Sequence, residues 1–174
     1  MTATGMINYA KRELIGGKPM PEISTRHLMT FRIQPPEPPL GPLEYGNTPL
    51  GFRWVMPVPG GTFTGDRLRG RIVFGSDWLI RRPDNATELN VRLTMETDDG
   101  HLIGMRYRGL RLGPEDVLQR HLDGDVVDAS EYYFRIAPFF ETASDKYGWL
   151  NTIIAVGIGD RTEDGPGYEI HEIL

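Results

Sequence analysis

The sequence predicts an all-β protein, on the evidence of its turn residues and its alternating side chains. Its 21 glycines and 14 prolines are spread along the chain and separate short runs in which apolar and polar side chains alternate. Such alternation is the period of a strand with one buried face, and frequent turns between strands are typical of sandwiches and barrels. About eight to ten strands are expected, which suits a closed or nearly closed antiparallel barrel with a filled or small-ligand interior.

The chain length predicts one domain. A chain of 174 residues with 39% hydrophobic residues can bury one substantial core. We therefore expect a single barrel domain over residues 1–174, in which residues 1–27 form a less regular N-terminal extension.

A hairpin is the clearest single element. In residues 88–109 apolar side chains occupy every second position before a turn at Asp99 and Gly100. Upstream, residues 67–74 and 77–82 are predicted as two strands, so that this part of the chain forms a meander.

Three further strands are expected in the C-terminal half. A strand at residues 132–136 should end before Pro138, because proline cannot donate to a sheet ladder. Residues 149–159 are predicted as a long apolar strand, and residues 168–174 as the last strand.

One short peripheral helix is predicted at residues 113–124. Pro114 suits its first position, and Gly124 suits its C-terminal end. Residues 34–51 are dense in proline and glycine, so we expect an extended, irregular segment that packs across a barrel end.

Composition excludes several classes of partner. A net charge of −5 and a pI near 5.4, without a basic run, argue against binding to nucleic acid or to an anionic membrane. The absence of cysteine excludes disulfides and thiol nucleophiles and fits a reducing compartment. No long apolar run suggests a signal peptide or a spanning helix, so a cytoplasmic location is expected.

The sequence also lacks the usual cofactor motifs. The four histidines have no metal-ligand spacing, and no serine lies in a Gly-x-Ser-x-Gly elbow. The Gly-Ile-Gly-Asp stretch at residues 157–160 lacks the rest of a dinucleotide pattern. We therefore expect neither a metal nor another cofactor.

Carboxylate, guanidinium and aromatic side chains remain as candidates for a site. An acid could transfer protons, an arginine could bind a carboxylate, enolate or phenolate, and aromatic rings could form apolar walls. The candidate catalytic residues are Asp77, Glu141, Arg92 and Arg135. The candidate substrate-binding residues are Trp78, Glu96, Tyr133, Tyr147, Trp149 and Asn151.

An ordinary structural interpretation competes with this one. If Val91, Leu93 and Met95 fill the interior, Arg92 lies outside in solvent, and for a single strand this is the commoner arrangement. Asp77 could equally belong to a turn, and the tryptophans could be packing residues.

Seven short motifs in fixed order resemble one protein family. They are GGTFTGDRLRG, SDWLIRRPD, TDDGHLI, RGLRLGP, YYFRIAPFFET, YGWLN and VGIG, and the resemblance covers about residues 28–174. The family is that of domain of unknown function 3237, and the resemblance implies a barrel of calycin-like or allene-oxide-cyclase-like form. It marks Asp77, Trp78, Arg92, the turn from Asp98 to Gly100, Arg135, Glu141 and residues 149–151.

The chain departs from the family pattern at two places. Phe74-Gly75-Ser76 precedes Asp77-Trp78 where Gly-Gly-Ala is usual, and Asn90 stands where an acid is common. The second departure weakens a role for a carboxylate at that position.

Together, the motifs and the resemblance favour an inward placement of Arg92 and Arg135, in a lumen open at one end. The expected function is that of a cofactor-independent isomerase, lyase or cyclase, which transfers protons on a small carbonyl, enol or phenolic substrate. A non-catalytic small-molecule binding protein and a purely structural domain are the alternatives. A homodimer formed through an outer sheet face is also expected.

Overall fold

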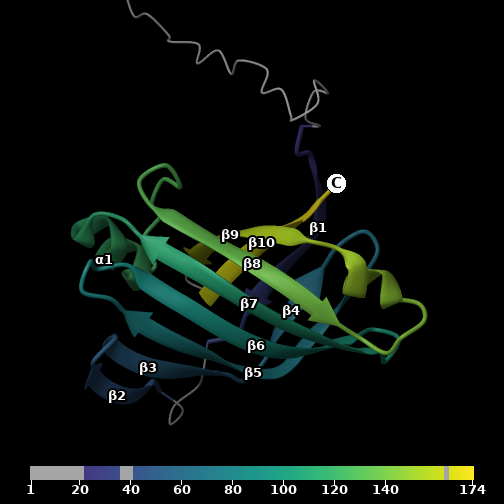
Figure 1. Cartoon of the computed structure of the whole chain (residues 1–174), viewed down its shortest axis with the longest axis horizontal. Helices are drawn as coiled ribbons and strands as arrows, with labels where there is room; N and C mark the ends of the chain where they lie inside the picture. The colour runs from purple at the N-terminus through teal and green to yellow at the C-terminus, as the bar shows by residue number, and fades with distance from the viewer. Residues whose placement is uncertain (1–21, 36–40, 163–164) are drawn as a thin grey trace, which may run out of the picture.

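The protein is an antiparallel β-barrel, as the sequence predicts (Figure 1). The computed structural model describes residues 22–35, 41–162 and 165–174. Its strands are β1 Thr25–Ile33, β2 Leu43–Thr48, β3 Gly51–Val58, β4 Gly61–Thr64, β5 Arg69–Arg81, β6 Thr87–Thr97, β7 Leu102–Leu112, β8 Tyr133–Glu141, β9 Ala155–Thr162 and β10 Gly165–Ile173.

Eight of these strands close the barrel. The order around the ring is β5-β4-β1-β10-β9-β8-β7-β6, and pairing of β6 with β5 closes it. β4 pairs with the first half of β5 and β3 with its second half, so that the β2–β3 hairpin extends the wall at one end. That end also carries the helix α1 (Figure 1).

The predicted hairpin is confirmed as β6 and β7. Apolar side chains at alternate positions of β6, from Leu89 to Met95, are buried, and their polar neighbours face outward. The turn between the strands uses Gly100 at a φ of 83°, a left-handed conformation that favours glycine.

The two strands predicted at residues 67–74 and 77–82 form one strand, β5. A shift of register between Ile72 and Phe74 marks a β-bulge where the sequence suggests a break.

Two predictions in the C-terminal half are wrong in detail. β8 continues through Pro138, because pairing of β9 with β8 is confined to Arg135 and Ile136, so no neighbour there needs an N–H group from the proline. Residues 148–152 form a 3₁₀ helix, η1 (Gly148–Thr152), and the apolar strand starts only at Ala155.

The helix α1 spans Glu115–Asp123, with Pro114 as N-cap and Gly124 as C-cap at a φ of 90°. It is more than a peripheral element, because His121 is fully buried and its Nε2 lies 3.2 Å from Asp160 Oδ1 on β9.

Among the described residues, no helix is long and apolar enough to cross a bilayer.

The N-terminal predictions are only partly met. β1 begins at Thr25, inside the predicted extension 1–27, and residues 43–48 form β2 rather than irregular chain. Residues 1–21 lie outside the described part, so most of the extension is untested.

The barrel interior is packed at one end. Met29, Met95, Ile103 and Ile170 are fully buried there. Next comes a layer of aromatic rings, in which Phe31 stacks on Tyr168 with centroids 4.5 Å apart, while Tyr107 and Phe134 lie 5.7 Å and 5.4 Å from Tyr168. Beyond this layer, toward α1 and β3, the interior is hollow.

Candidate functional site

A cavity of about 500 Å³ occupies the hollow end of the barrel. Its apolar walls include Trp54 and Met56 from β3, Leu79 from β5 and Phe134 from β8. A volume of this size suits a small organic ligand.

Asp77 is the buried acid of this cavity. Its side chain points inward from β5 and is 9% exposed, and its Oδ1 has no hydrogen-bond partner among the described residues. Burial raises the pKa of Asp77 to about 7, although the Asn90 backbone amide and the charge of Arg111 act in the opposite direction. The carboxyl group is therefore able to gain or lose a proton near neutral pH.

Arg111 is the buried cation of the same cavity. It points inward from β7, is also 9% exposed, and its Nε has no partner within the described part of the chain. Burial lowers the pKa of Arg111, yet a guanidinium still holds its charge at neutral pH. Its guanidinium carbon lies 5.9 Å from the centre of the Phe134 ring, which orients the group along the wall.

Two phenols lie close together beside the cavity. Tyr168 lines the cavity, and Tyr107 is buried next to it, with the ring centroids 5.7 Å apart and the two phenol groups close enough to interact. Burial raises the pKa of both phenols, and nearby Asp77 raises them further. Both hydroxyls therefore stay neutral and can donate hydrogen bonds.

The charges near the mouth are mostly positive. Arg81 and Arg161 line the cavity together with Arg111, whereas Glu44 and Asp77 are the acids on its surface. With Asp77 protonated, three guanidiniums face one carboxylate, which favours an anionic ligand or an anionic intermediate.

This arrangement suits proton transfer at a carbonyl or enol group. A carboxylate with a pKa near 7 can act as base, a fixed guanidinium can balance the resulting oxyanion, and neutral phenols can donate to it. Apolar walls strengthen each of these interactions by excluding water.

The expectation that Arg92 and Arg135 face the lumen is wrong. On β6 the buried side chains are Val91 and Leu93, and Arg92 is exposed on the outer face. Arg135 likewise lies on the outer side of β8, where it donates to the Phe134 carbonyl oxygen over 2.9 Å. The neighbouring apolar side chains occupy the inner face of both strands, so strand alternation turns these two arginines outward.

Several other predicted residues also lie on the outer face. Trp78, Tyr133 and Arg135 line an outer groove of about 690 Å³ that crosses β5 to β9. Glu96 forms an ion pair with Arg71 on the same side of the barrel. Trp78, Tyr133 and Arg135 share one groove, whereas Glu96 lies farther along β6. The barrel wall separates all four residues from Asp77.

The remaining predicted residues lie at the packed end. Glu141 ends β8 and is exposed, and Trp149 packs under Arg67, with the guanidinium carbon 3.7 Å from the ring centre. The Asn151 side chain brackets the backbone of Thr142 with two hydrogen bonds of 2.9 Å. None of these three residues lines the cavity.

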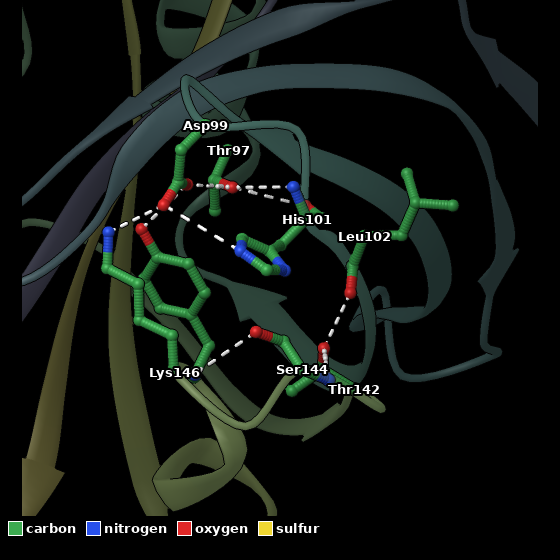
Figure 2. A network of polar contacts seen from close by, with 8 residues as sticks. Thr97, Asp99, His101, Leu102, Thr142, Ser144 and Lys146 are labelled. Carbon is green, nitrogen blue, oxygen red and sulfur yellow. Dashed lines mark hydrogen bonds and ion pairs between the residues drawn. The ribbon is translucent and has the colours of Figure 1, made fainter.

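Tyr147 belongs to a polar network at this end (Figure 2). Asp99 accepts hydrogen bonds from Thr97 Oγ1 at 2.6 Å, Lys146 Nζ at 2.5 Å and Tyr147 Oη at 3.0 Å. Above all, the bond from Lys146 holds the pKa of Asp99 well below its usual range. The network ties the β6–β7 turn to the loop after β8, which is a structural role.

Of the predicted site residues, Asp77 lines the cavity, whereas Arg111, Tyr107 and Tyr168, which lie in or beside it, were not predicted. The sequence carried a signal for Tyr107 and Arg111. Both lie at odd-numbered positions of β7, as Ile103 and Met105 do, so all four side chains point to the same face, and the first two are plainly core residues. An arginine that points to the same face as core residues of its strand is expected to face the lumen. Within residues 22–35, 41–162 and 165–174, no three His, Asp or Glu side chains form a group that could hold a metal.

Comparison with known proteins gives related sequences and barrels. A protein named UPF0311 protein from Rhodopseudomonas palustris (strain TIE-1) is 35% identical over 130 residues, which cover 74% of this chain and 85% of that protein. A solved beta-barrel like protein from Acinetobacter baumannii AYE is 36% identical, has a TM-score of 0.75, and the match covers 89% of this chain and 98% of that one.

A more distant structure shares the fold. An enzyme from Penicillium herquei superimposes with a TM-score of 0.67 over 92% of this chain and 100% of its own, at 19% identity, which is a likeness of fold alone.

The family assignment is direct. Residues 23–173 match the family described as Protein of unknown function (DUF3237), so the match extends over nearly all of the described chain. The seven motifs that suggested this family lie within the same span. The protein is therefore a member of the DUF3237 family.

Proposed function

We propose that the protein is a cofactor-independent isomerase, lyase or cyclase that transfers protons on a small carbonyl, enol or phenolic substrate in the barrel lumen. The proposal rests mainly on the environment of Asp77. Its buried carboxyl group has a pKa of about 7, its Oδ1 has no hydrogen-bond partner among the described residues, and it shares the cavity with Arg111. A site that leaves such groups without partners sacrifices stability, which is common at functional sites.

The proposed chemistry uses side chains of this chain alone. Ionised Asp77 removes a proton from the carbon next to a carbonyl group, and the C–H electron pair moves into the new carbon–carbon double bond as the carbonyl oxygen becomes an enolate. Arg111 balances the enolate charge, while Tyr168, which lines the cavity, donates a hydrogen bond to the oxygen. Return of the proton from Asp77 to another atom of the substrate completes an isomerisation and restores the base.

A solved barrel of the same fold that is described as an enzyme supports this proposal at the level of the fold only. The alternative, a non-catalytic binding protein, would use Arg111 and the apolar walls but would need no titrating base. The experiment must therefore separate binding from proton transfer.

Hydrogen–deuterium exchange into a bound carbonyl compound makes that separation. Small aromatic carbonyl acids that stabilise the protein against heat are incubated with it in deuterated water, and deuterium incorporation at the carbon next to the carbonyl is followed by NMR. Asp77→Asn keeps the shape of the side chain, so we expect similar affinity and an exchange rate lower by about a hundredfold or more.

Matched variants complete the test. Arg111→Gln should weaken binding, since a charge-assisted contact is worth about 1.5 to 3 kcal/mol, whereas Arg92→Gln on the outer face should change neither binding nor exchange. Tight binding without enzyme-dependent exchange would support the carrier instead. Full exchange by Asp77→Asn would show that Asp77 is not the base.

A further inference from the structure

An apolar strip is exposed on the outer face of β8 and β9. The strip consists of Ile154, which directly precedes β9, and of Val156, Ile158, Tyr133 and Phe139, all 41–55% exposed. Two arginines lie over its aromatic rings, with the guanidinium carbon of Arg135 5.1 Å from the centre of Tyr133 and that of Arg106 4.9 Å from the centre of Phe139. Large apolar side chains gathered on one exposed face point to a contact site.

The pattern of β9 is the reverse of a normal surface strand. Its inward positions hold Ala155, Gly157 and Gly159, while its outward positions hold the large aliphatic Val156 and Ile158. The glycines have a steric reason, because a Cβ at Gly157 would lie 2.6 Å from Ile170 and one at Gly159 would lie 2.6 Å from Phe134. The outward aliphatic side chains have no such reason within one chain.

The charges beside the strip are arranged in a row. Arg135 on β8 lies opposite Ile158 on β9, and Ile158 lies opposite Glu169 on β10. The Arg135 guanidinium forms no ion pair among the described residues, and Glu169, which is 65% exposed, has only His171 nearby at 3.9 Å. Ile158 thus has a cation on one side and an anion on the other, and all three residues lie at the same level along the strand direction.

We propose that a second copy of this chain covers the strip, with a two-fold axis that runs along β9. Rotation about such an axis places β8 of one copy over β10 of the other and leaves residues at the same height in register. Arg135 then faces Glu169 of the partner subunit, and Glu169 faces the partner's Arg135. The two sheets would pack face to face in the aligned manner of a sandwich, about 10 Å apart.

Charge balance favours this occupant over a small anionic ligand. A cation and an anion on opposite sides of an apolar centre complement their own copy under a two-fold rotation, as an isologous interface requires. An organic anion would meet Glu169 as well as Arg135. Apolar side chains with aromatic residues and arginine are also the usual composition of an interface core.

A charge-reversal experiment tests the arrangement independently of any enzymatic activity. We expect the parent protein to sediment as a dimer at micromolar concentration, and Arg135→Glu and Glu169→Arg each to sediment as monomers. An equimolar mixture of the two variants should form a heterodimer, because both pairs are then oppositely charged. Arg92→Glu, which reverses an exposed arginine on β6 outside the strip, should remain a dimer, and circular dichroism should show that all variants are folded.

Several results would overturn the proposal. A parent protein that remains a monomer throughout the micromolar range would do so, as would a dimer that survives both reversals. Failure of the mixed variants to associate would disprove the pairing, and dissociation by Arg92→Glu would place the interface elsewhere. The proton-transfer proposal would stand or fall separately, because the strip lies outside the lumen.

Discussion

At the scale of single residues, the site rests on the burial of one carboxyl group. Asp77 has an unpartnered Oδ1 among the described residues, and its backbone neighbour Trp78 faces the opposite side of the wall. Arg111 is close enough to lower the pKa of Asp77, but burial outweighs it. Asp77 is therefore mostly protonated below about pH 7, and a ligand that keeps Asp77 ionised at lower pH must add positive charge or hydrogen bonds.

Burial of Asp77 predicts a specific pH dependence of stability. Because the pKa of Asp77 is about 7 in the folded protein and its ordinary value is 3.8, the folded state holds the proton more tightly. The resulting stabilisation is complete below about pH 4, falls as pH rises toward about 7, and amounts to at most about 4 kcal/mol. Asp77→Asn removes this term, so its stability relative to the parent should increase from pH 4 to pH 7 in urea titrations. A difference that is constant with pH would contradict the raised pKa.

At the scale of elements, the bulge in β5 decides which side chains reach the lumen. Ile72 faces inward before the bulge, and strict alternation from there would turn Ser76 and Trp78 inward and Asp77 outward. The extra residue shifts the register between Ile72 and Phe74, so that Asp77 and Leu79 face inward instead. The acid of the site thus depends on an irregularity of one strand.

Close contact between β5 and β6 beyond the bulge predicts sensitivity at Gly75. A Cβ there would lie 2.4 Å from the Arg92 carbonyl oxygen, so Gly75→Ala should force the strands apart and cost about 1 to 3 kcal/mol. Gly104→Ala is the matched control, because its Cβ would meet Glu141 at an ordinary 3.5 Å. Urea unfolding measures both, and equal losses would mean that β5 can move without cost.

At the scale of the whole molecule, the barrel combines a packed half with a hollow half. The layer formed by Phe31, Tyr107 and Tyr168 separates them. Side chains on one side of this layer fill the interior, whereas side chains on the other side line the cavity. Groups that line a cavity are not selected for packing alone, so the two halves should differ in what they contribute to stability.

This division predicts unequal effects of truncation. Ile170→Ala in the packed half should cost about 2 to 5 kcal/mol, because it leaves a cavity in a filled core. Leu79→Ala on the cavity wall should cost less, because it enlarges space that already exists, and it should weaken ligand binding. Urea unfolding without ligand gives the comparison, and a larger loss for Leu79→Ala would argue that the hollow end is packed in solution.

Local pattern predicted much of the fold. The β6–β7 hairpin and the end of α1 at Gly124 follow from alternation and from a glycine in left-handed conformation. The strand expected at residues 149–159 is partly wrong, because residues 148–152 form a 3₁₀ helix. An apolar run by itself does not distinguish a strand from a short helix packed on the core.

The sequence by itself determined the all-β class, the family and the presence of an acid at Asp77 among possible site residues. Only the tertiary structure decided that Arg111, Tyr107 and Tyr168 join that acid, while Arg92 and Arg135 lie outside. The physical reason is that composition and alternation are local properties. The face that each strand turns to the lumen depends on ring closure, on register and on one bulge, which are set by contacts between distant parts of the chain.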